Sequence, residues 1–199
     1  MTGKTILALA LAATVGWQPA AAQREVAVEG AYLHGPARAV FPVQVGGFRR
    51  SRLLQYDSEG RDVSASYDLA TPAGRLLITV YIYPAAAAAP AARSLRCDEE
   101  FASANSAISS QHGNAAPVEQ GAALPAEGID RGLGHRSVYR FASPFDDRVQ
   151  DIRSEAHLYC YVGGDWLVKY RVSAPVAVET RGPVEAFIRN GPWPGRSST

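Results

Sequence analysis

Residues 149–173, VQDIRSEAHLYCYVGGDWLVKYRVS, decide the fold of this chain. Two runs rich in β-branched and aromatic residues flank Gly163-Gly164-Asp165, a composition typical of a hairpin turn. A three-residue loop places Val162 opposite Trp166, and regular pairing then continues along both strands. The predicted pairs are Tyr161 with Leu167, Cys160 with Val168, Tyr159 with Lys169, Leu158 with Tyr170, and His157 with Arg171.

This register sorts the hairpin into an apolar face and a polar one. The apolar face holds Val162, Trp166, Cys160, Val168, Leu158, Tyr170, Ala156 and Val172. The other face holds Tyr161, Leu167, Tyr159, Lys169, His157 and Arg171. A slip of one residue would set Lys169 opposite Leu158 and mix the faces, so we predict the regular register.

The first 22 residues are typical of a secretory signal peptide. Lys4 provides the positive start, an apolar stretch follows, and Ala20-Ala21-Ala22 provides small residues before the cleavage point. The apolar stretch is shorter than the roughly 20 residues that span a bilayer. We therefore expect cleavage after Ala22, a periplasmic or secreted protein, and no integral membrane segment afterwards.

A helix is predicted over residues 91–111, because Cys97, Phe101, Ala104 and Ile108 recur at helical spacing. Such a helix has to cover an apolar sheet face, and Cys160 lies on one. Since export leads to an oxidising compartment, we predict a Cys97–Cys160 disulfide. Two buried free thiols are the alternative, and a reactive cysteine nucleophile is a third interpretation.

The remaining patterns predict more strands and a second helix. Strands are expected over residues 48–56, 62–69, 75–83 and 136–141, and a short helix is expected to start at Pro183. We predict an α+β fold, with an antiparallel sheet of about five to seven strands on which the long helix and the C-terminal helix pack. Residues 23–40 form a leading segment, residues 41–194 a single domain and residues 195–199 a polar tail.

Composition excludes several classes of protein. The chain has 199 residues, 47% of them hydrophobic, and a formal net charge of +1. Removal of Lys4 with the signal peptide leaves a formally neutral protein, which lacks the basic character of a nucleic-acid binder. Two cysteines are too few for a disulfide-dense scaffold or a four-cysteine zinc site.

No catalytic, cofactor or metal motif was found in the sequence. The nucleophile elbow, the zinc-protease helix, the phosphate-binding loop and the dinucleotide fingerprint are all missing. The four histidines lie far apart along the chain. We therefore predict no catalytic residues, no metal ligands and no cofactor.

One constellation remains as a candidate ligand-binding surface. A sheet face rich in tyrosine and mixed charge can stack on a ligand and hold an acidic group. Cross-strand pairing on a solvated or helix-covered face is the alternative interpretation. The candidate residues are Arg153, Glu155, His157, Tyr159, Tyr161, Lys169 and Arg171.

Several short motifs carry a resemblance to known proteins. The motifs are F-P-x-x-x-G-G-F at residues 41–48, T-V-Y-I-Y at 79–83, W-L-V-K-Y-R at 166–171 and F-I-x-x-x-P-W-P at 187–194. With the signal peptide, they resemble small exported proteins of unknown function from Gram-negative bacteria, and the strand order is similar to a PsbP-like fold. This resemblance implies no activity.

We expect a periplasmic or secreted accessory or ligand-binding domain without catalytic activity. Its partner would be a small ligand or an envelope protein of unknown identity. The alternative is a small envelope-acting hydrolase with a site that only the fold assembles. A pocket with a buried histidine–carboxylate pair would favour the hydrolase, and an open tyrosine and arginine face would favour binding.

Overall fold

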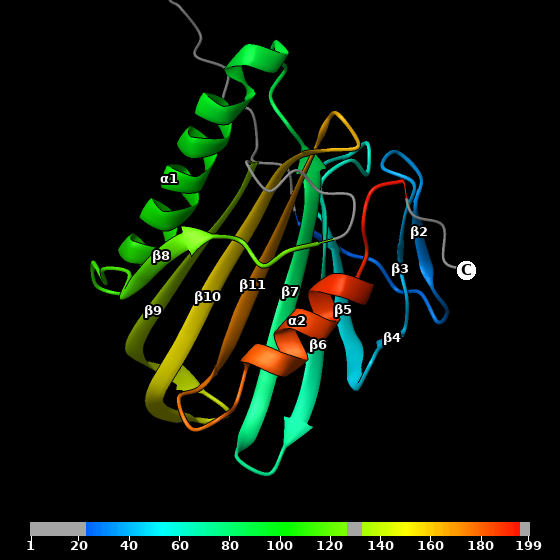
Figure 1. Cartoon of the computed structure of the whole chain (residues 1–199). Helices are drawn as coiled ribbons and strands as arrows, with labels where there is room; N and C mark the ends of the chain where they lie inside the picture. The colour runs from blue at the N-terminus through cyan, green and yellow to red at the C-terminus, as the bar shows by residue number, and fades with distance from the viewer. Residues whose placement is uncertain (1–22, 127–132, 196–199) are drawn as a thin grey trace, which may run out of the picture.

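A computed structural model describes residues 23–126 and 133–195 (Figure 1). The elements are β1 (Arg24–Glu25), β2 (Tyr32–His34), β3 (Ala39–Phe41), β4 (Gln44–Val45), β5 (Phe48–Gln55), β6 (Val63–Thr71), β7 (Gly74–Pro84), a 3-10 turn (Pro90–Ala92), α1 (Arg93–Gln111), β8 (Glu119–Ala122), β9 (Gly134–Phe145), β10 (Arg148–Val162), β11 (Trp166–Pro175) and α2 (Arg181–Asn190). The predicted signal peptide and residues 196–199 of the predicted tail lie outside the described residues. Neither helix in the described part has the length and apolar character to cross a membrane.

An antiparallel sheet of nine strands forms the body of the protein. Its order is β1-β5-β6-β7-β11-β10-β9-β8, with β4 also paired to β5, while β2 and β3 form a separate ladder. The predicted α+β fold with five to seven strands is therefore wrong, because the chain is mostly antiparallel sheet, with 47% strand and 20% helix. The surplus comes from strands such as β1, β4 and β8, which are too short to show an alternating pattern.

The leading segment, residues 23–40, lies against the sheet. Val26 donates its backbone N–H to the carbonyl of Leu53 over 2.9 Å, which continues the pairing of β1 with β5. The imidazole of His34 meets the edge of Trp166 at a ring distance of 5.4 Å.

The two helices cover opposite faces of the sheet. Alternation along β10 sends Tyr159 into the cluster that α2 covers and sends Leu158 into the cluster beneath Cys97 of α1. Figure 1 shows α1 beside β9 and β10, and α2 across the strands nearer the other edge. We call these surfaces the α1 face and the α2 face.

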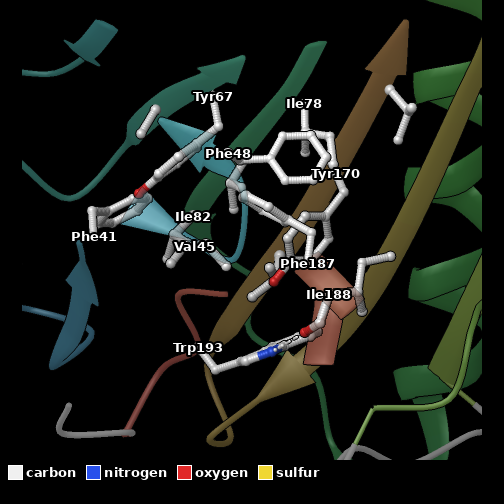
Figure 2. Packing of buried hydrophobic residues seen from close by; sticks show 14 of the residues in the cluster. Phe41, Val45, Phe48, Tyr67, Ile78, Ile82, Tyr170, Phe187, Ile188 and Trp193 are labelled. Carbon is white, nitrogen blue, oxygen red and sulfur yellow. Dashed lines mark hydrogen bonds between the residues drawn. The ribbon is translucent and has the colours of Figure 1, made fainter. Parts of the chain in front are cut away.

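The α2 face carries the larger core. Strands are expected over residues 62–69 and 75–83, and alternate side chains along β6 and β7 are indeed fully buried, among them Val63, Ala65, Tyr67 and Ile78. Phe187 of α2 lies edge-on to Phe48 and Tyr67, with ring centroids 5.0 Å away in each case (Figure 2). The predicted C-terminal helix is therefore confirmed.

Trp193, which follows α2, packs against this core. Its Nε1 donates to the carbonyl of Ile188 over 2.7 Å (Figure 2). The centroid of its ring lies 5.0 Å from that of Tyr159. The Pro-Trp-Pro ending thus packs against both α2 and β10.

The Cys97–Cys160 disulfide is confirmed, with the two Cα atoms 5.8 Å apart. It joins the first half of α1 to the end of β10. Helical spacing on one element and strand alternation on the other were enough to predict it, and the interpretation as free thiols is wrong.

The register of the β10–β11 hairpin differs from the predicted one. Val162 does lie opposite Trp166, but Tyr159 pairs with Val168 instead of Lys169, because a bulge interrupts the ladder between Tyr159 and Val162. Tyr161 adopts a φ of 56° at this bulge. The pairs predicted beyond the loop are therefore wrong by one residue.

The bulge has a packing reason. In a regular strand, consecutive side chains point to opposite faces, so Cys160 and Tyr161 could not share one. Here both belong to the cluster around Cys97 on the α1 face. Because of the extra residue, two consecutive side chains of β10 point toward α1. Tyr159 then points to the α2 face.

Candidate functional site

The predicted ligand-binding surface does not exist as one surface. The shifted register directs Arg153, Glu155, His157 and Tyr159 toward the α2 face, and it directs Tyr161, Lys169 and Arg171 toward the α1 face. The sheet itself therefore separates the two groups, and each must be considered alone.

Both tyrosines of the predicted surface are structural. The ring of Tyr159 is buried against Tyr170 and Trp193, and its hydroxyl donates to the carbonyl of Leu124 over 2.7 Å. Burial raises the pKa of Tyr159. Tyr161 donates its hydroxyl to the carbonyl of Ala86, and the guanidinium of Arg93 lies over its ring, 4.9 Å from the centroid.

A buried glutamate gathers polar groups on the α2 face. The Glu155 side chain is 4% exposed and accepts hydrogen bonds from Arg153 Nε at 2.7 Å and from His157 Nε2 at 3.1 Å. Arg136 of β9 approaches through Nη2 at 3.0 Å, and Thr180, just before α2, donates its hydroxyl at 3.2 Å. One carboxylate thus ties β9, β10 and the start of α2 together.

The electrostatics of this cluster keep the glutamate charged. Burial alone would raise the pKa of the Glu155 carboxyl, but the hydrogen bonds from His157 and Arg153, together with the charge of Arg136, hold that pKa well below its usual range. Burial is also the main cause that lowers the pKa of His157, and the two arginines add to it. Burial thus disfavours the protonated form of His157, which the charge of Glu155 favours, while the neighbours of Glu155 favour its ionised form.

Beside the cluster lies a groove of about 310 Å³, which we call the arginine groove. Three elements of the sheet and the first turn of α2 form it. Its lining consists of Glu119 of β8, Arg136 of β9, Arg153 and Glu155 of β10, Arg181 and Val184 of α2, and Leu124.

Arg153 is oriented toward this groove before any ligand arrives. Its only hydrogen bond within the described residues runs from Nε to Glu155, and its side chain is 22% exposed. Among residues 23–126 and 133–195, no acceptor bonds its Nη1 or Nη2 amino group. A guanidinium in this state can give two parallel hydrogen bonds to a carboxylate, phosphate or sulfate.

The groove offers little for proton transfer. The carboxyl of Glu155 has a strongly lowered pKa, which makes it a poor base, and His157 is completely enclosed with an exposure of 0%. Within residues 23–126 and 133–195, no group of three or more histidine, cysteine or acidic side chains is placed to hold a metal ion.

Sequence reasoning missed four polar members of this site. Glu119, Thr180 and Arg181 arrive from segments without a periodic signal. Arg136 could have been found, because a two-residue turn at Asp146-Asp147 sets a β9–β10 register that places it opposite His157.

Lys169 and Arg171 remain on the α1 face, two residues apart on β11. The Lys169 ammonium lies over the rings of Tyr81 and Tyr83, at 4.8 and 5.3 Å. Arg171 donates Nη2 to the hydroxyl of Ser154 over 3.3 Å. The predicted contact of this lysine with Tyr159 is replaced by contacts with the neighbouring strand β7.

In comparisons with known proteins, no protein family, curated protein or solved structure matches the chain.

Proposed function

We propose that this protein is an exported, non-catalytic binding domain that holds an oxyanion-bearing ligand in the arginine groove. The ligand would present a carboxylate, phosphate or sulfate to Arg153. Arg136 and Arg181 would add positive charge at the rim, while Leu124 and Val184 would contact an apolar part of the ligand.

The observation that carries this proposal is the hydrogen bond from Arg153 Nε to Glu155. A long arginine side chain normally loses conformational freedom when it binds. Here the hydrogen bond to the buried, charged Glu155 fixes the side chain of Arg153 when the protein folds, so that this conformational entropy is already lost before a ligand binds. The guanidinium is therefore preorganised for a bidentate ligand.

Export is supported by two features. The first 22 residues have the pattern of a signal peptide. The Cys97–Cys160 disulfide suits an oxidising compartment such as the periplasm or the medium.

The hydrolase alternative has one feature in its favour, the pair formed by Glu155 and His157 beside a groove. A general base has to lie within hydrogen-bond reach of the substrate. Since the His157 side chain is 0% exposed, the pair serves as a support for Arg153 more readily than as an acid–base couple.

The proposal is tested by calorimetric titration of the purified protein with phosphate, sulfate and acetate. We expect Arg153→Gln to weaken binding of the best of these anions by about tenfold or more, as loss of a bidentate charge-assisted pair requires. Arg153→Lys keeps the positive charge but lacks the paired N–H donors of the guanidinium, so it should also weaken binding.

The matched control is Arg148→Gln, which removes the same charge from an exposed arginine at the start of β10. It should leave the affinity unchanged. Equal affinities for the original protein and the Arg153→Gln variant would overturn the proposal.

A further inference from the structure

A second pair of cations lies on the opposite surface of the sheet, away from the arginine groove. Lys169 and Arg171 alternate with buried residues on β11 and therefore point to the α1 face, about 7 Å apart along the strand. The α1 helix contacts β10 and β9, and the part of the sheet beyond them carries half-exposed side chains.

Arg171 is a poorly compensated cation. It forms no ion pair with any described carboxylate, its one hydrogen bond goes to the Ser154 hydroxyl, and its buried Nε has no partner. Burying a guanidinium without an acceptor is costly, because the lost hydration is not replaced. An arginine held in this way has unused capacity to bind an anion.

Lys169 is positioned by aromatic rings. The ammonium lies over both Tyr81 and Tyr83, which fixes it by cation–π attraction without using its N–H donors. The negative charges of Asp62 and Glu100 attract the Lys169 ammonium from beyond ion-pair distance. Within the described residues, no oxygen accepts a hydrogen bond from this ammonium. Its donors are therefore also free.

Hydroxyl groups lie on the Arg171 side of this pair of cations. Thr79 lies opposite Arg171 and Ser66 lies opposite Thr79, with their oxygens 3.0 Å apart, while Ser173 follows two residues after Arg171 on the same face. Hydroxyls both donate and accept hydrogen bonds. They are suited to a ligand that has hydroxyls of its own next to an acid group.

We propose that Lys169 and Arg171 form a second binding site, which takes a small hydroxy acid of the acidic-sugar class. The acid group would lie between the ammonium and the guanidinium. The sugar hydroxyls would meet Ser66, Thr79 and Ser173. This site is independent of the arginine groove, because the sheet separates them.

The test is a titration of the purified protein, followed by NMR, with glucuronate as the probe and with acetate and glucose as its acidic and neutral halves. We expect glucuronate to shift the signals of Lys169, Arg171 and Tyr81, acetate to bind about tenfold more weakly, and glucose to have no effect. Arg171→Gln and Lys169→Gln should each lower the glucuronate affinity at least about tenfold.

Both variants should fold, because neither residue gives up an ion pair, and their melting temperatures verify this. Arg148→Gln is the charge-matched control and should bind glucuronate normally. Binding that is lost in Arg153→Gln but kept in Arg171→Gln would place glucuronate in the arginine groove and overturn this inference while supporting the proposed function. Equal binding of acetate and glucuronate, unaffected by either variant, would also overturn it.

Discussion

Arg153 donates its Nε to Oε1 of Glu155 over 2.7 Å, and both side chains face α2 because they lie two residues apart on β10. The carboxylate is buried and the guanidinium is partly exposed. Glu155 therefore acts as a positioning residue, and Arg153 is the group that can touch a ligand.

Glu155→Gln should destabilise the protein by about 2–4 kcal/mol, since removal of one partner leaves charged neighbours uncompensated. Urea unfolding provides the measurement. Glu119→Gln is the matched control, because Glu119 pairs with the same Arg136 but has a side chain 55% exposed. It should change the stability by less than about 1 kcal/mol. Similar losses in the two variants would contradict a special role for Glu155.

The pH dependence of stability should carry a contribution from His157. Its pKa in the folded protein lies below the ordinary value of 6.5, so below pH 6.5 the unfolded chain binds a proton that the folded protein refuses. The free energy of unfolding should therefore decrease as the pH is lowered below 6.5, by up to about 1.4 kcal/mol per pH unit for this one proton.

His157→Gln should flatten that slope, even if it lowers stability at every pH. The slope is the informative quantity, and chemical unfolding between pH 7 and pH 5 measures it. A variant with the same slope as the original protein would show that His157 takes up its proton in the folded state.

Loss of the Cys97–Cys160 disulfide should destabilise the protein by about 4 kcal/mol, the loop-closure value for a separation of 63 residues. Unfolding with and without a reductant provides the measurement. The double variant Cys97→Ser with Cys160→Ser is the control and should not respond to the reductant. A reductant effect below about 1 kcal/mol would mean that the reduced chain keeps the same constraints.

Arg171→Met should raise the melting temperature by a few degrees. Arg171 is half-buried and forms no ion pair within residues 23–126 and 133–195, so an apolar side chain of similar length removes an uncompensated charge. Differential scanning calorimetry measures the effect, and Arg148→Met provides the exposed counterpart. A clear loss of stability in Arg171→Met would show that the guanidinium stabilises the fold rather than serving a ligand.

Much of the fold is visible in the sequence because long strands alternate. Tyr67 and Ile78 are buried where the pattern predicts them, and helical spacing placed Cys97 beneath Cys160. Strands such as β8, with the sequence EQGA, contain too few residues to alternate. Pairing with β9 creates them, which explains the strand count that was too low.

The candidate site was harder to predict because it depends on one bulge. A regular ladder places Tyr159 beside Lys169, and the bulge at Tyr161 sends them to opposite faces. The bulge accompanies a tertiary contact, since it lets Cys160 and Tyr161 both join the cluster around Cys97 of α1. Arg153, Glu155 and His157 lie on one face, as predicted, because their relative alternation does not depend on the bulge.

The most direct test of the central claim is the NMR signal of the Arg153 guanidinium during titration with phosphate. We predict that its Nη resonances shift and become narrower as the anion binds. Its Nε resonance should change little, because that N–H already donates to Glu155. Shifts spread evenly over exposed arginines such as Arg148, with Arg153 unaffected, would contradict the account.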